Sequence, residues 1–252
     1  MAFLVDIDGT LIDAGRPVDG APAAVEELRR RGPLCFVTNT SRRSRADVAA
    51  SLRAAGFVAA PEDILSAGHA AAARLRERGV RRVQLLLTDS AAEDYADFDV
   101  VTESPEAVVV GDLGAEIDFP RINAAFRSLH AGAALVATQK NRFWKAADGP
   151  TLDAGAWVAA LEYAAGVTAE VVGKPEAGFF RAALGMLGAV PEAAWMVGDD
   201  VHSDVGGARA CGLRGVLVRT GKFDAAELAR AEPGRAPDLV VDSIAELPAA
   251  LP

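Results

Sequence analysis

The chain has 252 residues, 51% of them hydrophobic and 24% charged, a composition typical of a globular protein with a substantial core. Its net charge of -9 at pH 7 disfavours nucleic-acid binding, because such surfaces concentrate lysine and arginine against phosphate. The chain has only two cysteines, which is typical of a protein with buried thiols in a reducing compartment. Two cysteines are too few for a disulfide framework or a cysteine metal site. Asp6 and Asp8 interrupt the first apolar stretch, and no apolar run reaches membrane-spanning length, so we expect a cytoplasmic protein with no leader and no membrane partner.

Apolar runs alternate with amphipathic segments along the chain. The runs are residues 3–5, 34–37, 83–87, 107–110, 195–197 and 215–218. Runs of this length, separated by helical patterns, are typical of βα units. We therefore predict an α/β fold with a doubly wound parallel sheet.

Four helices can be predicted from their starts and stops. Pro22 opens the first, which Gly32 ends, and Ser41 is expected to cap the second, which Gly56 ends. The third follows Asp153 and carries an apolar stripe made of Trp157, Leu161 and Ala164, with Gly166 as its stop. The fourth ends at Gly188 and carries the stripe Phe180, Ala183, Leu184 and Leu187. We expect both stripes to lie in the core.

Two aspartates, Asp6 and Asp8, directly follow the first apolar run and precede Gly9. Side chains alternate along a strand, so strand geometry would send both carboxylates to the same side. The carboxyl edge of an open parallel sheet is where ligands usually bind. Taken alone, Asp-Ile-Asp-Gly is better explained as a solvated turn, and the rest of the chain favours a site.

Further polar clusters follow later apolar runs. They are Thr38-Asn39-Thr40, Gly173-Lys174-Pro175, and Gly198-Asp199-Asp200 with Asp204. Carboxylates suit a hard cation such as Mg²⁺, and a lysine supplies a fixed charge for a phosphoryl group. The clusters therefore predict a magnesium-dependent site for phosphoryl chemistry on a small phosphorylated substrate.

In these motifs the chain resembles the haloacid dehalogenase-like phosphohydrolase superfamily. Its four motifs match in order at Asp6 to Leu11, Thr38-Asn39, Lys174, and Gly198 to Asp204. Closer similarity, through residues 139–145, 160–164, 171–175 and 218–222, is to the phospholysine/phosphohistidine/inorganic pyrophosphate phosphatase branch. The long stretch between the second and third motifs implies an inserted α/β cap. We therefore expect a three-layer core of residues 1–67 and 171–252, with a cap of residues 68–170 and homodimerisation through that cap.

The resemblance also implies roles for individual residues. Asp6 would attack phosphorus to form an aspartyl phosphate, and Asp8 would first protonate the leaving oxygen and then activate water. Mg²⁺ would be held by the carboxylates of Asp6 and Asp199 and by the backbone carbonyl of Asp8. The phosphoryl oxygens would be bound by Thr38, Asn39, Thr40 and Lys174.

Two assignments have alternatives. Asp200 and Asp204 are expected to support the metal indirectly, or else to cap a helix over residues 205–210. The basic segment around Lys140 to Lys145, before the turn at Asp148, either reads the leaving group or forms a surface hairpin.

Three function classes fit the motifs to different degrees. A phosphatase for small phosphate esters, phosphoamides or pyrophosphate explains the most residues. A phospho-accepting receiver protein also gathers aspartates, a hydroxyl, a lysine and Mg²⁺, but leaves about half of this chain unexplained. A non-catalytic module that binds a phosphate ligand is disfavoured by the intact Asp6, Asp8, Lys174 and Asp199.

Overall fold

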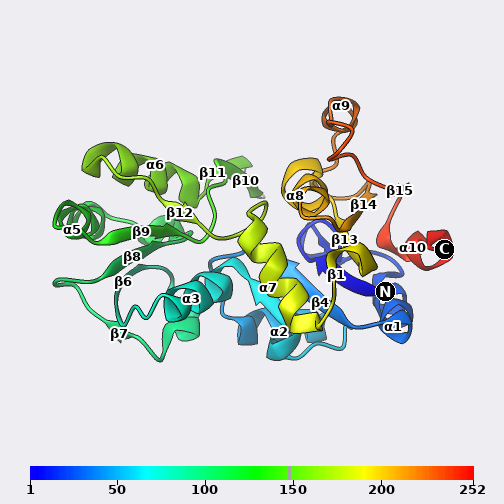
Figure 1. Ribbon diagram of the computed structural model, residues 1–252, viewed down its shortest axis with the longest axis horizontal. Helices are drawn as coiled ribbons and strands as arrows, with labels where there is room; N and C mark the ends of the chain where they lie inside the picture. The colour runs from blue at the N-terminus through cyan, green and yellow to red at the C-terminus, as the bar shows by residue number, and fades with distance from the viewer. Residues whose placement is uncertain (147–148) are drawn as a thin grey trace. The chain divides into compact units, whose positions relative to one another are not determined.

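The computed structural model describes residues 1–146 and 149–252, so the predicted turn residue Asp148 lies outside the described residues. The chain divides into two compact units. The first comprises residues 1–38, 48–65 and 174–252, and the second comprises residues 39–47 and 66–173. Each unit has its own parallel sheet with helices (Figure 1), which confirms the predicted α/β class.

The first unit is built on a six-stranded sheet in the order β15-β14-β13-β1-β4-β5. Its strands are β1 (Ala2–Asp6), β4 (Leu34–Thr38), β5 (Ile64–Ser66), β13 (Ala194–Gly198), β14 (Arg214–Val218) and β15 (Leu239–Val241). Strand β1 runs parallel to its neighbours β13 and β4. Every residue of these three strands is buried, as the continuous apolar runs predict for strands covered on both faces.

Helices cover both faces of this sheet and give three layers. On one face, Phe3 and Val5 share a core with Val25 and Leu28 of α1 (Ala21–Arg31) and with residues of α2 (Arg45–Ala54) and α10 (Leu247–Ala250). On the other face, α7 (Ala177–Leu187) contacts β4, and α8 (Gly207–Ala210) contacts β14. The predicted three-layer core is therefore confirmed.

The start of α2 differs from the prediction. The helix begins at Arg45, where the Ser44 hydroxyl accepts a hydrogen bond from the backbone N–H of Asp47 at 3.2 Å. Ser41 is not the cap, because its hydroxyl accepts from the backbone N–H of Asp112 at 2.9 Å. A tertiary contact thus engages the serine that the local pattern assigned to the helix end.

The second unit has a five-stranded sheet in the order β12-β9-β8-β6-β7. Its strands are β6 (Arg82–Leu86), β7 (Asp99–Val100), β8 (Ala107–Val110), β9 (Ala134–Ala137) and β12 (Glu170–Val171). Its helices are α3 (Ala67–Glu77), α4 (Asp89–Ala92), α5 (Phe119–His130) and α6 (Ala154–Ala165). One apolar cluster joins α5 and α6 to β6, β8 and β9, so this unit has a core of its own.

The predicted apolar stripes are confirmed except at Ala164 and Leu187. In α6, Leu161 is buried and Trp157 packs partly buried against the core, but Ala164 is exposed. In α7 Phe180, Ala183 and Leu184 are buried in the core, whereas Leu187, at the end of the helix, is only half-buried. The buried face of α6 is centred on Ala154, Val158 and Leu161, and at 100° per residue Ala164 lies beyond the edge of that face.

Shorter elements complete the fold. They are the hairpins β2 (Ile12–Asp13) with β3 (Arg16–Pro17) and β10 (Phe143–Ala146) with β11 (Gly149–Leu152), helix α9 (Ala225–Ala229), the 3₁₀ turns η1 (Pro61–Asp63), η2 (Glu93–Tyr95), η3 (Gly114–Glu116), η4 (Pro191–Ala193) and η6 (Ile244–Glu246), and the π-helical η5 (Val201–Gly206). Within the described ranges, no helix combines the length and the apolar character needed to cross a membrane.

Candidate active site

Three neighbouring strands of the first unit end at one edge of the sheet. Strand β1 ends at Asp6, β4 ends at Thr38, and β13 ends at Gly198, directly before Asp199. Because β1 pairs in parallel with the other two strands, their carboxyl ends meet at the same edge. The fold therefore brings together residues that lie far apart in the sequence.

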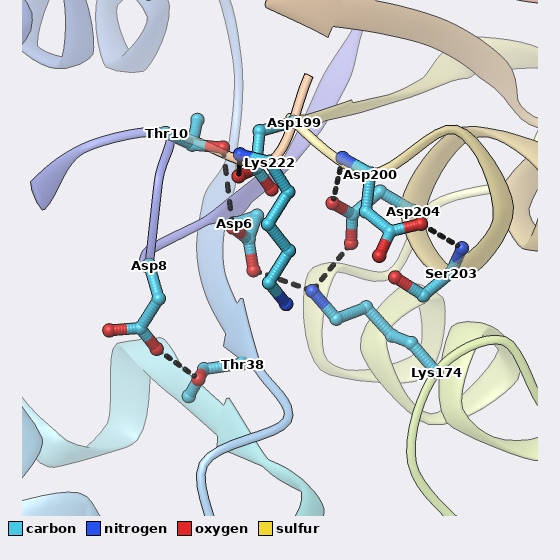
Figure 2. A network of polar contacts seen from close by, with 10 residues as sticks. All are labelled: Asp6, Asp8, Thr10, Thr38, Lys174, Asp199, Asp200, Ser203, Asp204 and Lys222. Carbon is cyan, nitrogen blue, oxygen red and sulfur yellow. Dashed lines mark hydrogen bonds and ion pairs between the residues drawn. The ribbon is translucent and has the colours of Figure 1, made fainter. Parts of the chain in front are cut away.

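Asp6 is buried at the centre of this edge, with 4% of its surface exposed. One of its carboxylate oxygens accepts from Lys174 Nζ at 2.5 Å, and the other accepts from the Thr10 hydroxyl at 3.2 Å (Figure 2). Each oxygen therefore has a donor, and the two bonds together fix the orientation of the carboxylate.

Lys174 bridges two aspartates. Its Nζ lies 2.5 Å from Asp6 Oδ1 and 2.6 Å from Asp204 Oδ1, and the residue is buried. Burial alone lowers the pKa of Lys174, but the charges of Asp204 and Asp6 outweigh it and the net pKa is raised. The lysine is therefore charged throughout the physiological pH range.

Three buried carboxylates crowd around this one ammonium. Asp6, Asp199 and Asp204 each offer an oxygen within 4.8 Å of the others. Burial and the charge of Asp204 raise the pKa of Asp199 to about 7. Burial also raises the pKa of Asp6 well above its ordinary value, because Lys174 offsets only part of the desolvation. The three carboxylates outnumber the one ammonium group of Lys174 and offer hard oxygen donors, so the residues fit a divalent cation such as Mg²⁺.

The structure assigns different contacts to the two aspartates for which alternatives were open. Asp200 caps η5, since its Oδ1 accepts from the backbone N–H groups of His202 and Ser203, both at 2.9 Å. Asp204 instead turns into the cluster, where its second oxygen accepts from the backbone N–H of Asp200 at 3.1 Å. Asp200 is therefore the helix cap, whereas Asp204 forms an ion pair with Lys174.

Asp8 lies beyond the end of β1, in the turn formed around Gly9. It is exposed, and its carboxylate accepts from the Thr38 hydroxyl at 3.1 Å (Figure 2). Alternation along a strand therefore does not apply to Asp8, because the strand stops at Asp6 and Gly9 turns the chain with a φ of 92°. The exposed position leaves this carboxyl accessible for proton exchange.

Two predicted site residues fall in the second unit. Asn39 and Thr40 directly follow Thr38 in the chain, but they belong to residues 39–47, which are part of the second compact unit. A Cβ atom at Gly173, in the same unit, would lie 2.6 Å from Asn39 Oδ1. The Asn39 side chain therefore packs against the backbone directly before Lys174.

The loop after β14 contributes site residues that the sequence analysis did not assign. The Thr220 hydroxyl donates to the backbone carbonyl of Gly9, and the backbone N–H of Lys222 donates to Asp199 Oδ2 at 2.7 Å. Thr10, whose hydroxyl donates to Asp6, was also not assigned to the site. Two signals were available for Thr220 and Lys222: they follow an apolar run, as the other site residues do, and they lie in residues 218–222, which resemble the phosphatase branch.

Gly221 allows this loop to approach the cluster. Its φ is +61°, and a Cβ atom there would lie 2.0 Å from Asp199 Oδ2. We expect Gly221→Ala to displace Asp199 and to lower activity at least about 10-fold, because strain of about 1–3 kcal/mol falls on a site residue. The measurement is kcat/KM together with the melting temperature.

Gly188→Ala is the matched control for Gly221→Ala. Gly188 has a similar φ of +59°, but a Cβ atom there would meet no heavy atom within 4 Å. Because the backbone strain is similar, Gly188→Ala should lose about as much stability as Gly221→Ala does from strain, but it should keep wild-type activity. Equal activity in the two variants would contradict a role for the close approach at Gly221.

This site defines an enzyme of phosphoryl chemistry, and comparisons with known proteins agree. The family described as haloacid dehalogenase-like hydrolase matches residues 3–101, and a related HAD-hydrolase-like family matches residues 171–247. A phospholysine phosphohistidine inorganic pyrophosphate phosphatase from Xenopus laevis is 41% identical, over 88% of this chain and 84% of the relative. Human haloacid dehalogenase-like hydrolase domain-containing protein 2 is also 41% identical, over 92% of this chain and 89% of the relative.

Solved structures agree with the sequence comparisons. The p-nitrophenyl phosphatase from Archaeoglobus fulgidus has a TM-score of 0.91 and 30% identity, covering 99% of this chain and 98% of that one. A glycerol phosphate phosphatase from Mycobacterium tuberculosis, in complex with magnesium, has a TM-score of 0.89 and 32% identity, covering 98% and 75%. The chain belongs to the haloacid dehalogenase-like hydrolase family, and it is a phosphohydrolase.

Proposed function

We propose that this phosphohydrolase is a Mg²⁺-dependent phosphatase for small phosphate esters, phosphoamides or pyrophosphate, with Asp6 as its nucleophile. The observation that carries the proposal is the buried Asp6 carboxylate, held by Lys174 and Thr10 beside Asp199 and Asp204. A carboxylate with fixed orientation, next to a lysine, suits covalent transfer of a phosphoryl group.

Two steps account for hydrolysis. In the first, an oxygen of Asp6 forms a bond to phosphorus while the bond from phosphorus to the leaving oxygen, or to the leaving nitrogen of a phosphoamide, breaks, and Asp8 gives its proton to that leaving atom. In the second, Asp8 takes a proton from water as the water oxygen attacks the aspartyl phosphate, which frees Asp6 and releases phosphate. The hydrogen bond from Thr38 and the exposure of Asp8 support this acid and base role.

Binding of the phosphoryl group is assigned to residues that offer hydrogen-bond donors. Thr38, Asn39 and Thr40 would donate to the phosphoryl oxygens. Lys174 would favour the ionised form of Asp6, because its charge lowers the pKa of that carboxyl, and would offset charge in the transition state; its two ion pairs support this role. Loss of such a donor typically costs on the order of 10²- to 10³-fold in rate.

Asp6, Asp199 and the backbone carbonyl of Asp8 would hold Mg²⁺. When bound, the ion supplies positive charge that stabilises the phosphoryl oxygens. An oxygen of Asp204 lies within 4.8 Å of the oxygens of Asp6 and Asp199. Asp204 would therefore support these two metal-binding carboxylates, either through its ion pair with Lys174 or by direct contact with the ion. The magnesium complex of the Mycobacterium tuberculosis relative supports this choice of cation.

We further propose that residues 68–170 act as the cap of the enzyme, with residues 1–67 and 171–252 as the catalytic domain. The independent core of the second compact unit supports this division. The relatives' names, which include phospholysine, phosphohistidine, pyrophosphate, p-nitrophenyl phosphate and glycerol phosphate, support a small phosphorylated substrate.

Phosphate release from a substrate panel tests the function. The panel comprises p-nitrophenyl phosphate, pyrophosphate, phospholysine, phosphohistidine, phosphoglycolate, sugar phosphates and nucleotides, each assayed with Mg²⁺ and with EDTA. We expect turnover with Mg²⁺, concentrated on one leaving-group class, and none with EDTA, because the crowded carboxylates then lack a counter-charge. A folded protein that hydrolyses no member would refute the proposal, and stable phosphorylation would favour the receiver alternative.

A further inference from the structure

Lys222 has its backbone fixed beside the acid cluster. Its N–H donates to Asp199 Oδ2 at 2.7 Å, and Gly221 directly before it packs against Gly9. The hydroxyl of Thr220 donates to the carbonyl of Gly9. Three consecutive residues therefore anchor the loop after β14 to both the Asp6 loop and Asp199.

The side chain of Lys222 extends from this anchor along the cluster. Figure 2 shows it running past Asp199 toward Asp6 and Lys174. The residue is exposed, in contrast to Lys174, which is buried with two ion pairs. Across residues 1–146 and 149–252, no carboxylate oxygen lies within the 4.0 Å ion-pair limit of Lys222 Nζ. Its N–H donors are thus open to a ligand.

An exposed lysine side chain carries a positive charge at neutral pH. A positive charge at this position attracts an anion in the site and repels a cation. Lys222 is therefore placed to act on the two ligands of the reaction with opposite signs.

We propose that Lys222 is a phosphate-binding residue whose ammonium group contacts the oxygens of the transferring phosphoryl group and, by its charge, weakens the binding of Mg²⁺ to the carboxylates. This inference rests on the proposed function. It adds a second lysine to the site beside Lys174, whose ammonium group is held by Asp6 and Asp204.

The test measures binding of the two ligands to Lys222→Met. Calorimetry with Mg²⁺ alone should show binding tightened about 3-fold, because a nearby like charge is removed. Inorganic phosphate, titrated at saturating Mg²⁺, should bind at least about 10-fold more weakly, since a charge-assisted hydrogen bond is lost. The KM for the best panel substrate should rise by a similar factor.

Two control variants isolate the effect of charge at this position. Lys222→Arg keeps the charge and should bind both ligands with the affinity of wild type. Arg219→Met removes a charge from the same loop, where Arg219 pairs with Asp242 at 2.7 Å on the surface, and should change neither affinity.

The outcomes separate this inference from the function on which it rests. Opposite shifts of the two affinities in Lys222→Met, absent from both controls, support it. Unchanged affinities overturn it, as does a parallel loss of both, which would indicate a displaced Asp199. If wild type hydrolyses a panel substrate and Lys222→Met keeps the wild-type affinities for Mg²⁺ and phosphate, the inference alone is refuted. If wild type hydrolyses no panel substrate, the proposed function is refuted.

Discussion

An Asp6→Asn variant should lose at least about 10⁴-fold in turnover, because a neutral amide cannot replace a carboxylate as the nucleophile. The two side chains have nearly the same shape. The amide oxygen can still accept from Lys174, as Asp6 does at 2.5 Å. We therefore expect the fold to be retained, with an unchanged circular dichroism spectrum and a melting temperature at or above that of wild type.

Removal of this charge acts on stability in a definite direction. Burial holds the pKa of Asp6 well above its ordinary value, so the ionised form is disfavoured in the crowded cluster. Loss of one of three neighbouring carboxylate charges relieves that repulsion. An inactive variant that is as stable as wild type would therefore separate chemistry from folding.

Asp13→Asn is the matched control for Asp6→Asn. Asp13 lies in the exposed β2–β3 hairpin that follows the Asp6 loop, so the same chemical change there leaves the cluster intact. Phosphate release by this variant should equal that of wild type. Turnover of Asp6→Asn near the control level would refute the aspartyl-phosphate mechanism.

The residues of the first sheet could be predicted from sequence because the signals are local. The run ending at Asp6 and the run ending at Gly198 consist of consecutive apolar residues, and both form fully buried strands. A buried parallel strand requires such a run, and its carboxyl end is where polar residues reach the edge. Strand identity and the meeting of Asp6, Thr38 and Asp199 at one edge followed from these two facts.

Contacts made by individual side chains were less predictable. Asp200 and Asp204 are four residues apart and chemically identical, yet one caps η5 and the other binds Lys174. The difference arises from the π-helical backbone of η5, which no propensity scale anticipates. Ser41 similarly carried a capping pattern, but its hydroxyl bonds to the distant Asp112.

The role of the loop after β14 in the site could not be predicted, because that role depends on a contact between distant segments. The Thr220 hydroxyl meets the carbonyl of Gly9 across 211 positions of sequence. Neither residue type is diagnostic alone, since threonine and glycine are common in turns. Only the three-dimensional structure identifies Lys222 as a neighbour of Asp199.

A Lys174→Met variant should be destabilised by about 3–5 kcal/mol, the usual cost of breaking a buried ion pair from one side. Lys174 Nζ binds Asp6 and Asp204 at 2.5 and 2.6 Å, and its removal leaves both carboxylates buried without their counter-charge. For a chain of this size, the melting temperature should fall by roughly 10 °C. Thermal unfolding in EDTA measures the effect without compensation by a bound cation.

The deficit of Lys174→Met should also depend on pH with a definite sign. Lys174 lowers the pKa of Asp6, so its loss raises that pKa further above the unfolded value. A carboxyl that binds its proton more tightly when folded gains stability as pH falls, and the deficit should shrink between about pH 8 and about pH 5. Lys140→Met, which breaks only the exposed pair with Glu162, should cost at most about 1 kcal/mol at either pH. A deficit that is equal at both pH values would indicate lost packing instead of unpaired carboxylates as the cause.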